Sequence, residues 1–287
     1  MTREAVGILF HPQVDRGQPL LNRVRKLLEQ RGVPHWEVLR ESSPRGLGGD
    51  LAATRFLLTL GGDGTFLHGA RLAAPHGVAV LGVNLGRLGF LTELDADKLP
   101  QGLERVLDGK FRIEERRLLQ LSVSREGRRT VRGLGVNEVV VQRGTEARLL
   151  RLQVSIDDQD VGTIDADGVV VATATGSTAY ALALGGPILE PSLPDLVFVP
   201  MNPFALTVRP IVFSPGAVSI TLPRDTAAIS IDGTARGKLR PGDTALIEGY
   251  DKPLRVARLG PPEDFYRTLR QKLGWGTPLV PFPGDGR

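Results

Sequence analysis

The sequence contains no cysteine, which excludes disulfide bonds, thiolate nucleophiles and cysteine metal sites. Its four histidines, His11, His35, His68 and His76, all lie in the first third of the chain, and none has the spacing of a metal-ligand pair. No apolar run approaches the roughly 18 residues that a membrane span needs. The N-terminus carries one short apolar run without a cleavage-like site, which predicts a first strand. We therefore expect a cytoplasmic protein with no membrane partner and no tightly held transition metal.

Several motifs of known chemistry are also missing. The absence of Gly-x-x-x-x-Gly-Lys-Ser/Thr excludes a P-loop, and the lack of a full Gly-x-Gly-x-x-Gly fingerprint disfavours a Rossmann dehydrogenase. There is no Gly-x-Ser-x-Gly motif and no histidine in the C-terminal half, so a hydrolase triad has little support. The net charge of +4 suits small polyanions such as nucleotides, and no long Lys/Arg run or aromatic-rich basic patch points to nucleic acid.

The length of 287 residues predicts about two domains. In residues 1–116, apolar strands alternate with amphipathic helices, which predicts a parallel, Rossmann-like sheet with right-handed crossovers. The expected strands are 6–10, 36–39, 56–60 and 78–83, and the expected helices are 19–31, 66–74 and 99–107. Ligands of such sheets bind at the carboxyl ends of strands.

The pattern changes after about residue 116. Short alternating strands with regular turns fill residues 117–260 and predict an all-β, sandwich-like domain. One Ala/Leu helix interrupts them after Gly176-Ser177. Pro261-Pro262 then opens a final helix, and residues 261–287 are expected to form this helix and a tail.

The stretch Gly61-Gly62-Asp63-Gly64-Thr65 stands between a predicted strand and a predicted helix. A strand, a glycine turn and a helix start together present free backbone N–H groups to an anion such as phosphate. A carboxylate repels phosphate, so Asp63 makes sense where it faces a hydroxyl that must lose a proton, or a cation that bridges phosphates. The alternative is an Asp-Gly hairpin turn, which fits poorly because the following residues do not alternate.

Three further stretches could join Asp63. Asn137-Glu138 precedes a strand and suits a ribose or an adenine edge, although a surface position is the ordinary alternative. Asp165-Ala166-Asp167-Gly168 could bind sugar hydroxyls or a metal, or form a solvated turn. The stretch 175–180 combines four hydroxyl side chains with a helix start, and it suits either a binding site or a helix cap.

With these stretches, the sequence resembles the NAD kinase family. The resemblance is carried by Gly61-Gly62-Asp63-Gly64-Thr65, Asn84 to Thr92, Asn137-Glu138, the block from Asp167 to Ile188, Arg209-Pro210-Ile211-Val212 and Lys272-Leu273-Gly274-Trp275. Diacylglycerol and sphingosine kinases share the Gly-Gly-Asp-Gly piece, whereas the block from Asp167 to Ile188 is far more specific to NAD kinases.

The resemblance implies transfer of a phosphoryl group from ATP or polyphosphate to the 2′-hydroxyl of the adenosine ribose of NAD. It implies that Asp63 is the catalytic base, that Mg²⁺ accompanies the donor, that the last helix packs back on the N-terminal domain, and that subunits form homodimers or homotetramers. The donor phosphates would contact Gly61, Gly62, Gly64 and Thr65. The residues that the resemblance places around NAD are Asp63, Gly64, Phe90, Asn137, Glu138, Arg148, Asp165, Asp167, Thr175, Thr178, Ala179, Tyr180, Ala181, Leu182, Ala183, Asn202 and Thr234.

The sequence leaves some choices open. Position 165 carries Asp where many bacterial members of the family carry a basic residue, so the preference between NAD and NADH is open, and so is the choice of donor. A lipid kinase of the same superfamily and a non-catalytic nucleotide sensor are the alternative functions. The lipid kinase predicts turnover of diacylglycerol, and the sensor predicts binding of ATP and NAD without formation of NADP.

Overall fold

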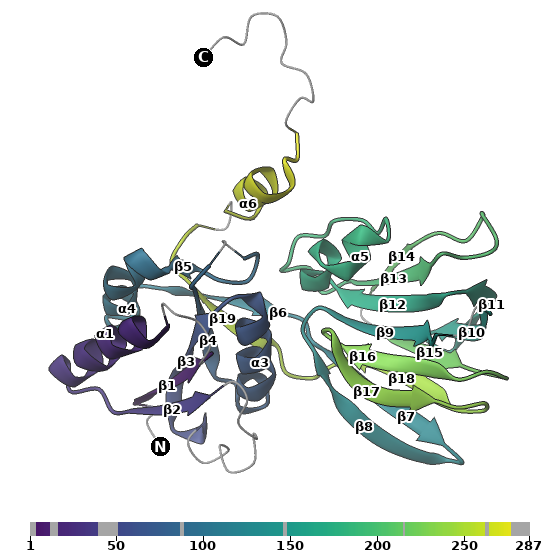
Figure 1. The fold of residues 1–287 in the computed structure, drawn as a ribbon, viewed down its shortest axis with the longest axis horizontal. Coiled ribbons are helices and arrows are strands. Elements are labelled where there is room, and N and C mark those ends of the chain that lie inside the picture. The colour runs from purple at the N-terminus through teal and green to yellow at the C-terminus, as the bar shows by residue number, and fades with distance from the viewer. Residues whose placement is uncertain are drawn as a thin grey trace, which may run out of the picture.

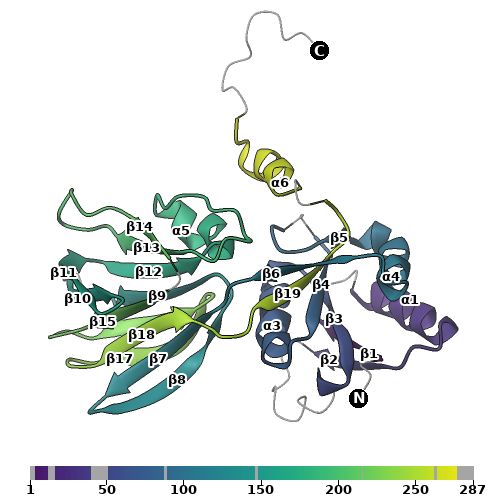
Figure 2. The same ribbon diagram turned by 180° about the vertical axis from the view of Figure 1, so that it is seen from behind.

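The computed structural model describes residues 4–11, 17–39, 51–86, 89–145, 148–214, 216–261 and 264–276. An α/β part and a β-rich part lie side by side, joined by two extended crossings of the chain (Figures 1 and 2). This arrangement confirms the predicted fold class of an α/β domain, an all-β domain and a C-terminal helix. No helix among the described residues combines the length and the apolar character that crossing a bilayer requires.

The α/β part is built on one mixed sheet with the order β2-β1-β3-β4-β19-β6, and β5 pairs with β4 outside this path. Its strands are β1 (Ala5–Phe10), β2 (His35–Leu39), β3 (Thr54–Gly61), β4 (Ala79–Asn84), β5 (Leu94–Asp95), β6 (Arg112–Arg116) and β19 (Leu254–Arg258). The central strands β3 and β4 run parallel and are almost entirely buried, because helices cover both of their faces.

The helices of this part are α1 (Gly17–Gln30), α3 (Asp63–Ala73) and α4 (Leu99–Leu107). A 3-10 turn at Ala74–His76 follows α3, and another at Ala96–Lys98 precedes α4. Helices α1 and α4 share one hydrophobic core with one face of the sheet, and α3 packs in a second core on the other face. Figure 1 shows α3 on the side of the sheet that faces the β-rich part. The start of α3, which carries the glycine turn, therefore lies near the junction of the two parts.

The β-rich part is a sandwich of two six-stranded antiparallel sheets, with the orders β11-β10-β15-β18-β7-β8 and β14-β13-β12-β9-β16-β17. The strands are β7 (Leu119–Arg125), β8 (Arg128–Gly135), β9 (Glu138–Arg143), β10 (Leu150–Ile156), β11 (Gln159–Ala166), β12 (Gly168–Thr173), β13 (Leu196–Met201), β14 (Ile211–Phe213), β15 (Ala217–Thr221), β16 (Ala227–Ile231), β17 (Thr234–Leu239) and β18 (Thr244–Gly249). Alternate residues of both sheets meet in one apolar core, as the alternating sequence pattern predicts.

Two short helical turns follow β12: a 3-10 turn, η3 (Thr175–Thr178), and a single α-helical turn, α5 (Tyr180–Ala183). The Ala/Leu helix expected here is thus only four residues long. The chain turns just after this helix at Gly185, whose φ of +79° lies in the left-handed region that favours glycine.

The last strand, β19, returns to the first sheet although its residues fall inside the stretch expected to form the second domain. It pairs in parallel with β4 through Val256 and Val80, and antiparallel with β6. The helix α6 (Asp264–Leu273) follows and lies above the junction of the two parts (Figures 1 and 2). The chain therefore enters the sandwich from β6 and leaves it into β19, its neighbour.

Candidate active site

The glycine turn lies between the end of β3 and the start of α3. Gly62 is the N-cap of α3, with an extended backbone and no side-chain capping hydrogen bond, so the first N–H groups of the helix face outward. Gly62 and Gly64 are exposed, whereas Gly61 and Thr65 are buried. A Cβ atom at Gly61 would lie 2.2 Å from Thr65 Oγ1, so packing requires glycine there, while a Cβ at Gly62 would meet nothing within 4 Å. An anion can therefore approach the amides at Gly62 and Gly64.

The Asp63 carboxylate is held in place by the loop after β4. Its Oδ2 accepts a hydrogen bond of 3.1 Å from Phe90 N, and its Oδ1 accepts one of 3.3 Å from Leu91 N. A Cβ atom at Gly89 would lie 1.7 Å from Asp63 Oδ1, so only glycine allows this approach. A carboxylate has about four lone-pair sites, so two remain for a substrate hydroxyl. Asp63 is half-buried and can still be reached from outside.

Asn84 shapes the strand end next to this turn. It pairs with Gly61 in the register of β3 and β4, and its side chain makes hydrogen bonds to both backbone groups of Gly86, at 3.0 and 3.1 Å. Asn84 thus closes the turn at the carboxyl end of the sheet, where ligands of parallel sheets bind.

A second wall comes from the end of the sandwich that faces α3. Thr173 Oγ1 donates to the carbonyl oxygen of Val136 at 2.6 Å and accepts from Gly176 N at 3.0 Å. A Cβ atom at Gly176 would lie 2.0 Å from the carbonyl oxygen of Asn137, so glycine permits the close contact. These contacts fix the 3-10 turn against Asn137-Glu138. The sequence-predicted residues gathered at this end are Asn137, Glu138, Thr175, Thr178, Ala179, Tyr180, Ala181, Leu182, Ala183 and Thr234.

Two buried oxygens of this wall lack hydrogen-bond partners among the described residues: Glu138 Oε2 and Thr175 Oγ1. Burial raises the pKa of Glu138 to about 7, repulsion from Asp232 adds to the shift, and a hydrogen bond from the Tyr180 backbone N–H opposes it. Buried polar atoms normally have partners, so unpaired ones at a junction indicate a place for a polar ligand.

The two parts are tied together by an ion pair between α3 and the sandwich. Arg71 Nη1 lies 2.6 Å from Asp232 Oδ2, and the Asp232 side chain is fully buried. Asp232 also accepts hydrogen bonds from the backbone N–H groups of residues 136, 137 and 138, the nearest at 2.8 Å. The only local feature of the sequence at this position is the pair Asp232-Gly233, which is typical of a hairpin turn. The pair does form the turn between β16 and β17, and Asp232 has a φ of +44° there. Its contacts to Arg71 and to residues 136–138 are non-local, and sequence reasoning missed them.

Four predicted residues lie at the opposite end of β12. Asp167 accepts from Arg143 at 2.6 Å and from Asn202 at 3.3 Å, and Asp165 forms an ion pair with Arg151 at 2.7 Å. Arg148 lines a surface hollow with Asp165. β12 spans six residues, which corresponds to roughly 17 Å at about 3.3 Å per residue. The structure thus separates Arg148, Asp165, Asp167 and Asn202 from the wall beside Asp63.

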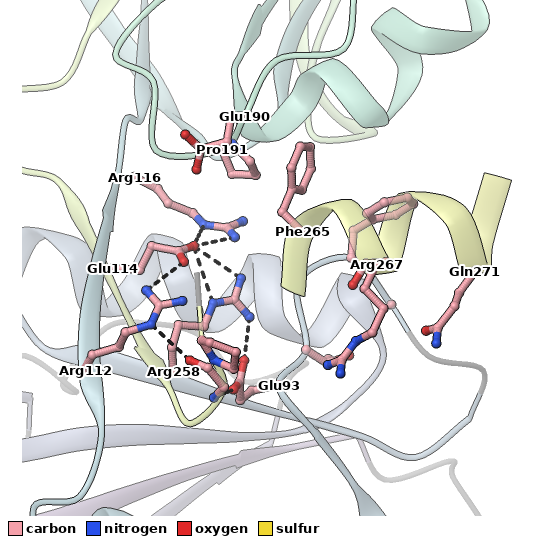
Figure 3. A pocket seen from close by; sticks show the side chains of 16 residues that line it. Glu93, Arg112, Glu114, Arg116, Glu190, Pro191, Arg258, Phe265, Arg267 and Gln271 are labelled. Atoms are coloured by element: carbon pink, nitrogen blue, oxygen red, sulfur yellow. Dashed lines mark hydrogen bonds and ion pairs between the residues drawn. The ribbon is translucent and has the colours of Figure 1, made fainter. Parts of the chain in front are cut away.

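A charged cavity lies on the other side of the loop that holds Asp63. Figure 3 shows Glu114 surrounded by the guanidinium groups of Arg112, Arg116 and Arg258. Burial opposes ionisation of Glu114, but Arg116 and Arg258 lower its pKa to about 2. Burial and repulsion from Arg258 lower the pKa of Arg116 to about 10, although Glu114 opposes this. The causes differ: burial is the largest cause of the shift in Arg116, whereas neighbouring guanidinium groups lower the pKa of Glu114 against the effect of its burial.

Residues of this cavity also hold the end of β19 in place. Glu93 accepts from Arg258 Nη1 at 2.8 Å and from the backbone N–H groups of Leu259 and Gly260 at 2.6 and 2.8 Å. Phe90 and residues of α6 complete the lining. The loop that holds Asp63 is therefore braced from behind by β6, β19 and α6.

Comparison with known proteins identifies the family. The ATP-NAD kinase N-terminal domain matches residues 50–111, and the ATP-NAD kinase C-terminal domain matches residues 136–259. The NAD kinase of Heliobacterium modesticaldum is 38% identical over 281 residues, which cover 94% of this chain and 99% of the relative. The NAD kinase of Nitrosospira multiformis is 43% identical over 228 residues, which cover 78% of this chain and 77% of the relative.

Two solved structures share the fold. Yeast NADH kinase complexed with NADH aligns with a TM-score of 0.83 at 23% identity, covering 98% of this chain and 90% of that chain. An NAD kinase from Archaeoglobus fulgidus in complex with ATP aligns with a TM-score of 0.73 at 24% identity, covering 94% and 98%. The site at the junction, the family matches and the relatives lead to one conclusion: this chain belongs to the NAD kinase family and is a kinase.

Proposed function

We propose that this protein transfers the terminal phosphoryl group of ATP or polyphosphate to the 2′-hydroxyl of the adenosine ribose of NAD. The observation that carries the proposal is the position of Asp63, which lies beside exposed glycine amides with its carboxylate fixed by the amides of Phe90 and Leu91. The relatives named NAD kinase, and the structures solved with NADH and with ATP, support NAD and ATP as the substrates.

In the proposed reaction, the amides at Gly62 and Gly64 and the start of α3 attract the negative donor phosphates. Gly61 and Thr65 are buried and shape the turn rather than face the donor. Asn137, Glu138 and the turn 175–180 form the wall that would receive the dinucleotide. The unpaired oxygens of Glu138 and Thr175 support this assignment, because a ribose or an adenine edge offers them partners.

The proton of the acceptor hydroxyl passes to Asp63 while the hydroxyl oxygen bonds to the terminal phosphorus. The bond between that phosphorus and the bridging oxygen breaks, and the electron pair leaves with the shortened donor. Asp63 is the suitable base because its carboxylate can accept a proton and is positioned here by two fixed N–H groups.

Mg²⁺ would accompany the donor. Among the residues that the structure describes, no three His, Asp or Glu side chains gather into a metal-binding group. One carboxylate beside a row of amides fits an ion that arrives on the phosphates and keeps several waters. Asp63 would lie next to it, and the ion would neutralise phosphate charge.

A coupled assay of the purified protein tests the proposal, with ATP or polyphosphate as donor and NAD or NADH as acceptor. We expect NADP or NADPH to form, and phosphorus NMR of the product to show a 2′-phosphomonoester. Binding of both substrates without product would contradict the proposal and support a sensor, and turnover of diacylglycerol instead of NAD would support the lipid kinase.

A further inference from the structure

The C-terminal helix α6 places a cation on its inward face. The residues of α6 that are buried or half-buried are Phe265, Thr268, Leu269 and Lys272, at the spacing of one helical face, and Leu269 is only 4% exposed. The other cations of the helix, Arg267 and Arg270, are exposed. An apolar residue is usual at the position of Lys272, because burying a lysine ammonium is costly.

Lys272 points at the loop that holds Asp63. Its Nζ lies 5.2 Å from the centroid of the Phe90 ring, within the range of a cation–π contact. The backbone N–H of Phe90 donates to Asp63 Oδ2, so one residue links the ammonium and the carboxylate. Burial lowers the pKa of Lys272 from its usual range, and attraction to the Asp63 carboxylate opposes this shift.

The arrangement suits a group that binds phosphate as it moves. During phosphoryl transfer, negative charge spreads over three equatorial oxygens between the attacking and the leaving oxygen. A lysine on a flexible stem carries three donors and can follow those oxygens. A cation that lies on an aromatic face is half shielded from water, so it attracts a phosphate more strongly than an exposed cation does. Turning it from the ring toward the phosphate costs little free energy.

We propose that Lys272 donates hydrogen bonds to the oxygens of the phosphoryl group that is transferred at Asp63, which makes α6 part of the active site. The proposal rests on the proposed phosphoryl transfer for its role in the reaction. Its physical content, an anion contact at Lys272, can be tested apart from turnover.

Three variants of the full chain test the contact. Lys272→Met keeps the stem and removes the charge, Lys272→Arg keeps the charge, and Arg270→Met removes an exposed cation from the same helix. We expect Lys272→Met to lower kcat/KM for the donor by about 10- to 100-fold, while the dissociation constant for NAD changes less than about twofold. Lys272→Arg should recover most of the loss, and Arg270→Met should match the wild type.

Binding of inorganic tripolyphosphate, measured by calorimetry, gives a readout that needs no turnover. We expect Lys272→Met to bind tripolyphosphate at least about tenfold more weakly than wild type and Arg270→Met. Equal binding of tripolyphosphate by wild type, Lys272→Met and Arg270→Met would overturn the proposal. Equal losses of NAD affinity and donor affinity in Lys272→Met would also overturn it, because they would mean that the helix is displaced. If wild type forms no NADP while Lys272→Met still loses tripolyphosphate binding, the proposed function fails and the anion contact stands.

Discussion

Asp63 has an orientation that depends on three neighbours in one loop. The amides of Phe90 and Leu91 hold its two oxygens, and Gly89 leaves the space that they occupy. The carboxylate therefore has a fixed direction before any substrate binds, which is what a general base needs in order to work without rearrangement.

Replacing Asp63 by Asn should lower the rate of NADP formation by about 10²–10⁴-fold, because an amide cannot take up the proton of the hydroxyl. The dissociation constant of NAD, measured by calorimetry, should change little, because the amide has nearly the same shape. Near-normal NADP formation by the variant would remove Asp63 from the chemistry.

Gly89→Ala should displace the carboxylate without unfolding the chain. The added Cβ would lie 1.7 Å from Asp63 Oδ1, so the side chain must turn away. We expect a loss of about 10- to 1,000-fold in kcat, since a misplaced base loses much of its contribution. Gly144→Ala is the matched control, because a Cβ there meets nothing within 4 Å. Equal activity of the two variants would mean that Asp63 does not need this orientation.

Glu138 should give NAD binding a pH dependence. Burial and the nearby Asp232 raise its pKa to about 7, so it is protonated below that pH and ionised above it. An ionised carboxylate accepts hydroxyl hydrogen bonds at both oxygens. NAD should therefore bind more tightly as the pH rises, and be roughly tenfold weaker near pH 6 than near pH 8.

Calorimetry over this pH range checks the prediction, with Glu138→Gln as the comparison. The variant should show a flat profile, because its amide does not titrate. A wild-type affinity that falls with rising pH would reverse the assigned role of Glu138.

At the scale of elements, α3 connects the two halves of the site. Its first residue is Asp63, and its last turn carries Arg71, which contacts the buried Asp232 of the sandwich. Asp232 in turn holds the backbone just before and at Glu138. One helix therefore sets the distance between the Asp63 carboxylate and the wall proposed for NAD.

Arg71→Met should weaken both folding and substrate binding. The change leaves Asp232 as a buried carboxylate without its cation, which should lower the free energy of unfolding by about 3 kcal/mol. KM for NAD should rise more than KM for the donor, because the wall formed by Asn137 and Glu138 loses its link to α3. Denaturant unfolding and steady-state kinetics measure the two effects.

Arg23→Met removes an exposed arginine of α1 and serves as the control. Stability of Arg71→Met equal to that of this control would show that the ion pair contributes nothing to the junction.

At the scale of the whole molecule, local patterns were sufficient for most of the fold. The 3.6-residue period of α1, the alternation in β7 and β10, and the glycine turn after β3 all follow from neighbours in sequence. The residues 99–107 were expected to be helical and match α4. Such elements can be predicted because their apolar residues already mark the face that is buried.

Contacts between distant segments could not be predicted in the same way. The apolar run of β19 predicts a strand, but it does not tell which sheet the strand joins. The pairing of Arg71 with Asp232, and the approach of Lys272 to Phe90, depend on how the two parts pack. The resemblance to the family places Asp165 and Asp167 around NAD together with Asn137, whereas β12 separates them within this chain. A homodimer or homotetramer stays a prediction.

The central claim is that Asp63 takes the proton of the 2′-hydroxyl of the adenosine ribose. A crystal structure of the Asp63→Asn protein with NAD and a non-hydrolysable ATP analogue tests it most directly. We predict that the side chain of residue 63 lies about 2.6–3.2 Å from the 2′-oxygen. The 2′-oxygen, the terminal phosphorus and the bridging oxygen of the donor should lie roughly in line. A ribose bound out of reach of residue 63, or turned so that another hydroxyl faces it, would contradict the account.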